Sequence, residues 1–172
     1  MISIVTGSAR PNNVSEALAN EVLRVCKDAD VEVQVINLRE LDLPFVNSPM
    51  PPSSPDFTIT DEKVQQWHDA VSASDGMIFL TPTYNYQPSA VLKNAIDWLY
   101  TPWAEKPVAV IGYSWGEDKA SEPLLETLLK QVNASVAAES VHLRFTADIA
   151  PDGSLLDAAR FDEVVTSLVK AL

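Results

Sequence analysis

The sequence predicts a three-layer α/β fold, in which helices cover both faces of a five-stranded parallel sheet with the strand order 2-1-3-4-5. Short apolar segments alternate with longer segments of helical periodicity along the chain, as in successive right-handed βαβ units. The segment GMIFLTP (76–82) is apolar throughout, which is typical of a strand covered on both faces. With 172 residues and no internal repeat, the chain is expected to form a single domain, 1–172.

Five segments are expected to form the sheet. MISIVT is short and apolar, VEVQVINL alternates apolar and polar residues, and PVAVIGYS is apolar in the same way as GMIFLTP. SVAAESVHL is the expected last strand. The predicted strands therefore cover residues 1–6, 31–38, 76–82, 107–114 and 135–143.

Apolar residues spaced three or four positions apart indicate the helices. These are expected at residues 15–29, 60–74, 89–100, 121–132 and 154–172. Ser15 and Thr60 are the expected N-caps of the first two, and Glu16 suits the positive end of the helix dipole. The proline- and serine-rich segment 43–57 has no period and is expected to be an ordered excursion within the domain.

Composition excludes several classes of function. The 24 acidic and 12 basic residues give a net charge of −12, which argues against nucleic acid and anionic lipid as partners. No apolar run approaches the ~20 residues of a membrane span, and the N-terminus lacks a signal-peptide pattern. Cys26 is the only cysteine, and His68 and His142 lie in no metal-ligand spacing. A metal-free, cytoplasmic domain is expected.

The loop GSARPNNVS (7–15) follows the first strand and has the composition of an anion site. In the predicted strand order it lies at the switch point, where such sheets bind ligands. Its glycine permits close approach, its hydroxyls and amides can donate hydrogen bonds, its arginine suits phosphate, and the next helix begins there. The candidate residues are Gly7, Ser8, Arg10, Asn12, Asn13, Val14 and Ser15. The alternative is a polar turn that caps the helix, with the arginine solvated.

Two further loops are expected beside the first. TPTYNYQPS contributes Pro82, Thr83, Tyr84, Asn85 and Tyr86, whose aromatic faces and amide could meet a ring with an imide edge. Alternatively, its tyrosines pack on the domain surface.

GYSWGEDK contributes Ser114, Trp115 and Gly116, with the indole positioned to lie along a ring. Alternatively, Trp115 covers the core beneath it. A phosphate site beside two aromatic, amide-bearing loops predicts a mononucleotide ligand, and flavin mononucleotide (FMN) fits.

Three stretches resemble the NAD(P)H-dependent FMN reductase family, flavodoxin-like proteins that include quinone, chromate and azo-dye reductases. GSARPNNVS resembles the family's Gly-Ser-x-Arg phosphate loop. PTYNYQPSAVLKNAIDWLY resembles its signature, Pro-x-Tyr-Asn followed by Leu-Lys-Asn-Ala-Ile-Asp-Trp. KPVAVIGYSWG resembles its fourth strand and the loop against the flavin. The resemblance spreads over nearly all of the chain, in the family's order.

The resemblance implies a site, position by position. It assigns the phosphate to Ser8, Arg10, Asn13 and Ser15. It assigns one side of the ring to Pro82, Thr83, Tyr84 and Asn85, and the other to Ser114, Trp115 and Gly116. It further implies NADPH or NADH as hydride donor, a small-molecule electron acceptor, and a homodimer or homotetramer. We expect the subunit interface at Trp98, Trp103 and the excursion 44–57.

The chain departs from the family pattern at several positions. Thr83 stands where many members have Glu, and Asn12 stands where Gly is frequent. Pro88 falls one place earlier than the family's usual proline. Glu117 and Asp118 replace a glycine-rich run, which places acidic side chains near the expected approach of anionic NADPH.

The leading functional hypothesis is an FMN-dependent NAD(P)H oxidoreductase that passes hydride through FMN to a flavin, a quinone or a similar acceptor. No Ser-His-Asp or Cys-His arrangement competes with it, and no side chain is expected to act as a covalent nucleophile. The first alternative is a flavodoxin-type electron carrier without nicotinamide activity, which the acidic composition favours. The second is a non-catalytic sensor or interaction module on the same fold.

Overall fold

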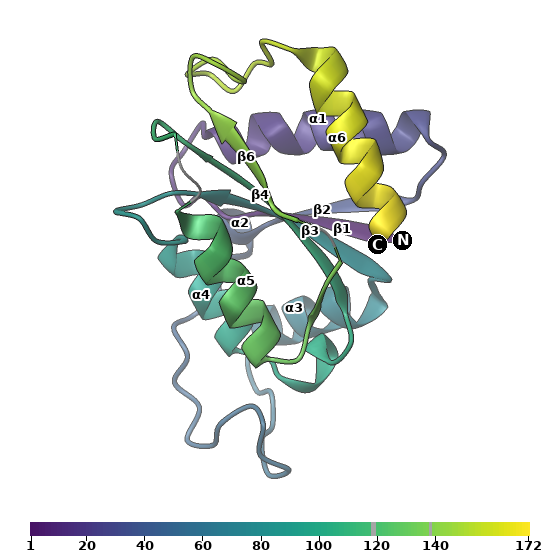
Figure 1. Ribbon diagram of the computed structural model, residues 1–172. Coiled ribbons are helices and arrows are strands. Elements are labelled where there is room, and N and C mark those ends of the chain that lie inside the picture. Colours follow the sequence, from purple (N-terminus) through teal and green to yellow (C-terminus); the bar gives the residue numbers. More distant parts are fainter. Residues whose placement is uncertain (118–119, 138) are drawn as a thin grey trace.

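The computed structural model describes residues 1–117, 120–137 and 139–172, and it confirms the predicted parallel sheet. The strands follow the order β2-β1-β3-β4-β5, and β6 also pairs with β4, all in parallel (Figure 1). Their bounds are β1 Ile2–Thr6, β2 Val33–Asn37, β3 Gly76–Pro82, β4 Pro107–Ser114, β5 Ser135–Val136 and β6 Val141–Arg144.

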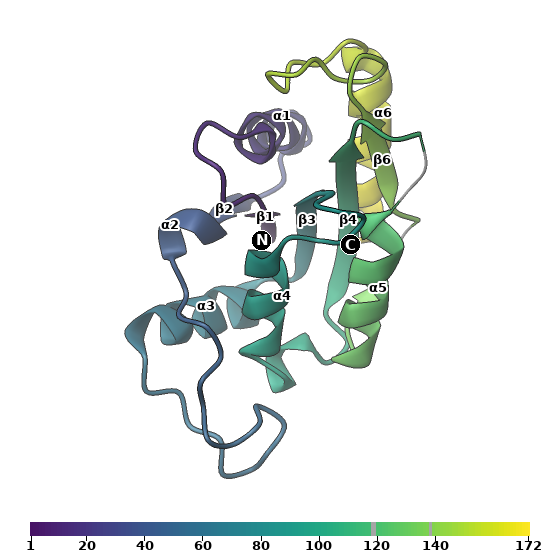
Figure 2. The same cartoon turned by 90° about the vertical axis from the view of Figure 1, so that its left-hand side faces the viewer.

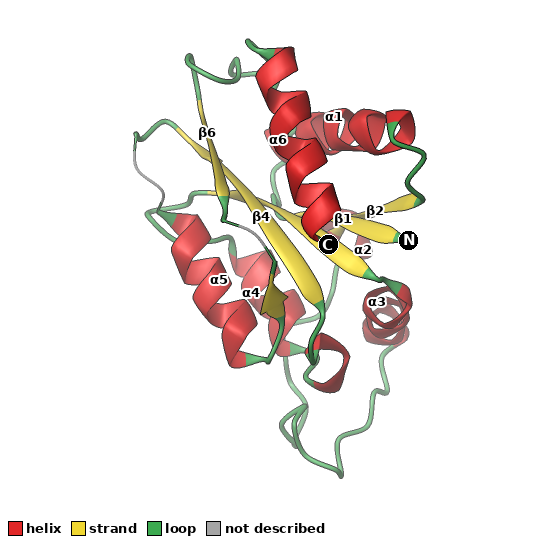
Figure 3. Ribbon diagram, turned by 45° about the vertical axis from the view of Figure 1, so that its right-hand side comes forward, coloured by secondary structure: helices red, strands yellow, loops and turns green. Residues whose placement is uncertain are grey.

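Helices cover both faces of this sheet and complete the three layers. Helices α1 and α6 lie on one face, whereas α3, α4 and α5 lie on the other (Figure 3). Their bounds are α1 Val14–Asp28, α2 Leu38–Leu41, α3 Glu62–Ala73, α4 Ala90–Asp97, the 3-10 turn η1 Thr101–Trp103, α5 Ser121–Gln131 and α6 Ala158–Ala171. Within the described residues, no helix has the length and apolar character needed to cross a bilayer.

Strand β3 lies at the centre of both cores, and every residue in it is buried. Met77 and Phe79 pack with the α3, α4 and α5 side, while Ile78 and Leu80 pack with the α1 and α6 side. Successive side chains of a strand point to opposite faces, so a continuous apolar run supplies two cores at once. This rigid centre fixes the carboxyl ends of β1, β3 and β4 side by side.

The fifth strand differs from the prediction. One strand was expected over residues 135–143, but β5 and β6 are two short pieces that pair with different parts of β4. β5 pairs with Pro107 and Val108, and β6 pairs with the stretch from Ile111 to Ser114. The residues between them include alanine, glutamate and serine, which have weaker strand preference than valine.

Trp98 and Trp103, around which the subunit interface was expected, do not offer their side chains to a partner, because both belong to the core of this chain. Trp103 is fully buried, 5.9 Å from the ring of Trp67, and its indole N–H donates to the Ile96 carbonyl. Trp98 is 5% exposed and donates to the Pro44 carbonyl at 2.7 Å. Tryptophan buries a large apolar area once its N–H has a partner.

The excursion itself extends beyond the α3 and α4 layer as a long loop (Figure 2). Its exposed apolar side chains are Phe45, Val46 and Met50. Asn94 of α4 holds the start of the loop, since its amide donates to the Pro44 carbonyl and its side-chain oxygen accepts the Val46 N–H. The excursion is therefore anchored at its base, where Phe45 and Val46 are exposed, and Met50 is exposed further along it.

Candidate functional site

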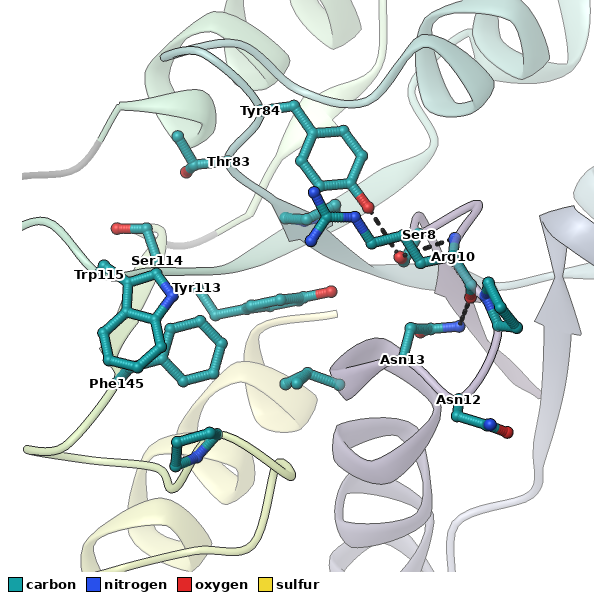
Figure 4. A pocket seen from close by; sticks show the side chains of 14 residues that line it. Ser8, Arg10, Asn12, Asn13, Thr83, Tyr84, Tyr113, Ser114, Trp115 and Phe145 are labelled. Carbon is teal, nitrogen blue, oxygen red and sulfur yellow. Dashed lines mark hydrogen bonds between the residues drawn. The ribbon is translucent and has the colours of Figure 1, made fainter.

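A pocket of about 510 Å³ opens at the carboxyl ends of β1, β3 and β4 (Figure 4). It collects residues from all three predicted loops and from the segment after β6. The predicted residues that line it are Ser8, Arg10, Asn12, Asn13, Val14, Pro82, Thr83, Tyr84, Ser114 and Trp115. Four further lining residues were not expected from the sequence, namely Pro11, Tyr113, Phe145 and Pro151.

The first loop presents unpaired donors to the pocket. Asn13, rather than the expected Ser15, is the N-cap of α1, and its side-chain oxygen accepts the Glu16 N–H. Asn12 has a left-handed backbone (φ 49°), a conformation that asparagine tolerates. Within the described residues, the backbone N–H groups of Asn12, Asn13 and Val14 reach no acceptor. A helix start with free N–H groups favours an anion.

Arg10 adds a positive charge beside these amides. Its guanidinium carbon lies 5.0 Å from the centre of the Tyr84 ring. The Tyr84 hydroxyl is 2.9 Å from the Ser8 hydroxyl, which also accepts the Arg10 N–H at 3.3 Å. No carboxylate of the described chain pairs with Arg10, so its charge is available to a ligand.

Gly7 and Ser15 take structural positions outside the pocket lining. A Cβ on Gly7 would lie 2.3 Å from Leu92 of α4, so glycine is required here for packing rather than for approach of a ligand. The Ser15 side chain is buried, and its hydroxyl is 2.8 Å from the hydroxyl of Tyr113. These contacts fix the direction in which the first loop leaves β1.

The second loop divides into an inner part and an exposed tip. Thr83 and Tyr84 line the pocket, whereas Asn85 and Tyr86 form a turn with left-handed backbones (φ 51° and 64°). Tyr84 and Gln87 exchange two backbone hydrogen bonds across this turn, and Tyr86 is 79% exposed. The tip residues lie beside the pocket and do not line it.

The third loop supplies an aromatic wall. Trp115 is 66% exposed, so it does not cover the core, and its ring lies 4.7 Å from that of Phe145. Tyr113 meets Phe145 edge-on at 6.0 Å. Gly116 is exposed and does not line the pocket, and Glu117 pairs with Arg144 at 2.8 Å. Asp118 lies outside the described residues.

Tyr113 and Phe145 are the main additions to the predicted site. Burial raises the pKa of the Tyr113 hydroxyl to about 12, although its bond with Ser15 opposes this, so the phenol stays protonated at neutral pH. Tyr113 precedes the third loop at the end of β4, and Phe145 follows β6 directly. Their positions at the ends of β4 and β6 were a signal that they lie near this edge, because carboxyl ends of parallel strands meet there, but which side chain enters the pocket depends on the register of the two strands.

The arrangement can bind an elongated ligand with an anionic end and a flat aromatic end. Arg10 and the free amides gather at one end of the pocket, and Trp115, Phe145 and Tyr84 border the rest (Figure 4). Among the described residues, no cluster of His, Cys, Asp or Glu could hold a metal ion. The donor chemistry therefore fits a phosphorylated aromatic cofactor such as FMN.

Comparison with known proteins gives consistent matches. The model of the NADPH-dependent FMN reductase family matches residues 1–148. An NAD(P)H-dependent FMN reductase from a Nectria species is 32% identical over 85% of this chain and 76% of its own length. An NAD(P)H:quinone oxidoreductase from Solanum tuberosum is 28% identical over 64% of this chain and 56% of its own length. The solved structure of a flavoenzyme NAD(P)H:(acceptor) oxidoreductase from Paracoccus denitrificans is 26% identical, with a TM-score of 0.71, and the match covers 98% of this chain and 94% of that one.

Proposed function

We propose that this chain, which belongs to the NADPH-dependent FMN reductase family, binds FMN in the pocket at the carboxyl ends of β1, β3 and β4. It is an oxidoreductase that uses NAD(P)H to reduce a small-molecule acceptor such as a flavin or a quinone. Bound there, FMN would supply the two-electron redox chemistry between the nicotinamide and the acceptor. The observation that carries this proposal is one pocket with an anion-binding end and an aromatic end.

We assign the phosphate to the first loop. The free N–H groups of Asn12, Asn13 and Val14 would donate to its oxygens, and Arg10 would neutralise its charge. Ser8 adds a hydroxyl that is already oriented by Tyr84. Charge-assisted bonds of this kind are roughly twice as strong as neutral ones.

We assign the ring to the aromatic end. Tyr84 and Trp115 would border it, and Thr83 and Ser114, which also line the pocket, carry hydroxyls that could meet its edge. Because Asn85 and Gly116 lie beside the pocket, their contact with the ring stays a prediction. The same holds for Tyr86, which the sequence also placed at the ring.

The chain's own residues bind and orient rather than react. The Tyr113 phenol keeps its proton at neutral pH, and no side chain of the pocket is required as a nucleophile. The exposed Trp115 leaves one side open for a nicotinamide ring to stack at about 3.5 Å. We infer that the nicotinamide and the acceptor use this opening in turn, because a domain of 172 residues has little room for two separate sites.

This sharing of one opening gives the functional test. Steady-state rates are measured with NADPH or NADH against a quinone, over a grid of both concentrations. Parallel reciprocal plots, the pattern of a ping-pong mechanism, are expected. Intersecting plots would require donor and acceptor to bind together, which contradicts a shared opening.

The electron-carrier alternative is not favoured, because the matching family and the compared relatives are named as reductases and oxidoreductases.

We further propose a homodimer or homotetramer, supported by the apolar excursion that carries Phe45, Val46 and Met50. We also propose a cytoplasmic location without nucleic-acid partners, supported by the net charge of −12 and the lone Cys26.

A further inference from the structure

A buried ion pair lies directly behind the third loop. The side chain of Glu122 in α5 is fully buried, and its Oε1 is 2.5 Å from Nδ1 of His142 in β6. Its Oε2 accepts the Ala120 N–H at 3.1 Å and the Ser121 hydroxyl at 3.3 Å. Gly112 makes the necessary room, because a Cβ there would lie 2.1 Å from Oε1. The carboxylate is therefore fitted into the sheet face with all its hydrogen bonds made.

The contacts of His142 favour a doubly protonated ring. Its Nδ1 faces the Glu122 carboxylate, and its Nε2 lies 3.1 Å from the carbonyl oxygen of Gly116. These two partners are acceptors only, and a neutral imidazole has one N–H to donate, whereas the Ser114 hydroxyl, 3.3 Å from Nε2, can donate or accept. The hydrogen bond with Glu122 raises the pKa of His142, and burial opposes this only in part. Burial likewise opposes ionisation of Glu122, but the bonds from His142 and from backbone amides outweigh it and lower the pKa of Glu122.

The other charged groups around His142, within the described chain, are either acidic side chains or arginines that already pair with an acidic side chain. Asp148, which follows β6, raises the pKa of His142 by its charge. Asp157 and Arg160 line a small cavity with His142, and Arg160 pairs with Asp148 at 2.9 Å. On the pocket side, the Arg144 guanidinium pairs with Glu117. The surroundings thus favour the imidazolium over the neutral ring.

This pair connects two walls of the pocket. Ser114 and Trp115 line the pocket, and the Ser114 hydroxyl accepts the Gly116 N–H at 3.0 Å and lies 3.3 Å from His142 Nε2. On the other side of the pair, the Ser121 hydroxyl is 3.0 Å from that of Thr83 in the second loop. A continuous hydrogen-bonded chain therefore runs from the second loop through the buried pair to the third loop.

We propose that the Glu122–His142 pair is a proton-dependent positioning device for the turn Ser114–Gly116, in which the imidazolium holds the Gly116 carbonyl and so fixes Trp115 against the bound ring. Loss of the His142 proton removes the donor that holds this carbonyl, and the turn is released. His142 is a positioning residue, since it acts through the turn. The proposal rests on the proposed function, because it assumes a flavin in this pocket.

The first test uses the wild-type protein. The ring signals of its two histidines, His68 and His142, are followed by NMR against pH without flavin, and the variant His68→Gln assigns them. The dissociation constants of FMN and riboflavin are measured over the same range. Riboflavin is included because a phosphate itself titrates near pH ~6. Both dissociation constants should rise roughly tenfold as the pH is raised through the midpoint of the His142 titration. A tenfold change is the size expected for the loss of one charged hydrogen bond.

A matched pair of variants separates the device from general effects of charge. Glu122→Gln keeps the shape of the side chain and should move the His142 midpoint and the loss of flavin affinity together to lower pH. Glu126→Gln removes a charge one turn further along α5, where Glu126 faces Lys130, and should leave both unchanged. If Glu122→Gln does not fold, the wild-type protein still tests the proposal. The midpoint of the His142 titration must then coincide with the midpoint of the loss of flavin affinity.

The outcomes also distinguish this proposal from the proposed function. Flavin binding that stays constant while His142 titrates would overturn the positioning device and leave the reductase assignment intact. A His142 signal that titrates at or below the ordinary histidine range would overturn it as well. Absence of flavin binding at every pH would overturn both, with the NMR titration still reporting on the pair.

Discussion

Arg10 is the side chain that we expect to contribute most to binding at the proposed phosphate end of the pocket. It is a pocket-lining cation with no carboxylate partner in the described chain, and it lies over the Tyr84 ring. Arg10→Ala should weaken FMN binding by about 1–3 kcal/mol, the range for a charge-assisted hydrogen bond, and should hardly change riboflavin binding. Fluorescence titration with both ligands measures the difference.

A second arginine provides the control for this prediction. Arg39 lies near Glu16 at 3.8 Å and does not line the pocket, so Arg39→Ala should leave FMN affinity unchanged. Equal losses of FMN and riboflavin affinity in Arg10→Ala would mean that Arg10 does not contact the phosphate. The phosphate would then have to be held by the backbone amides alone.

Gly112 shows how one residue makes a buried charge possible. In Gly112→Ala the new methyl group would overlap the Glu122 carboxylate, which has no free space to move into. We expect a loss of unfolding free energy of about 1–3 kcal/mol, the usual cost of overpacking. Urea denaturation of the flavin-free protein measures it. Gly116→Ala is the matched control, because the nearest atom would be 3.5 Å away, and it should be close to neutral.

At the scale of elements, the sequence predicted the three loops but not every side chain that reaches the pocket. The switch point follows from strand order, which the alternation of segments indicates. Ser15 was expected as N-cap, yet the N-cap of α1 is Asn13, two residues earlier, because asparagine caps equally well and the Ser15 hydroxyl bonds with Tyr113. Helix boundaries depend on such local competition, which periodicity does not resolve.

The excursion between α2 and α3 is the element that best suits a partner subunit. Phe45, at the anchored base of this excursion, is 79% exposed, whereas Trp98 and Trp103, which were expected at the same interface, are buried. Phe45→Asp should convert the proposed dimer to a monomer, because an interface core does not tolerate an unpaired charge. Light scattering at micromolar concentration measures the mass. Leu124→Asp, on the exposed side of α5, should remain dimeric, and a wild-type monomer would contradict the proposed assembly.

At the scale of the whole molecule, the fold could be predicted because each sequence pattern that indicates it extends over a whole strand or helix. Apolar strands, helical periodicity and right-handed connections together leave few arrangements of the sheet. The site could be predicted only in part, since Phe145 and Tyr113 reach the pocket through the register of β6 against β4. The split of the last strand and the Glu122–His142 pair depend on the same register. Such contacts between distant segments are not encoded in any local pattern.

The whole molecule is assigned as a nicotinamide-dependent reductase, and that claim has one direct measurement. Protein loaded with FMN is mixed without oxygen with NADPH and, separately, with NADH, and the yellow absorbance is followed in time. Free FMN at the same concentration is the control. The account predicts that at least one nicotinamide bleaches the protein-bound flavin within seconds. If neither does, while a chemical reductant bleaches it fully, the chain binds FMN without nicotinamide activity and the reductase assignment is contradicted.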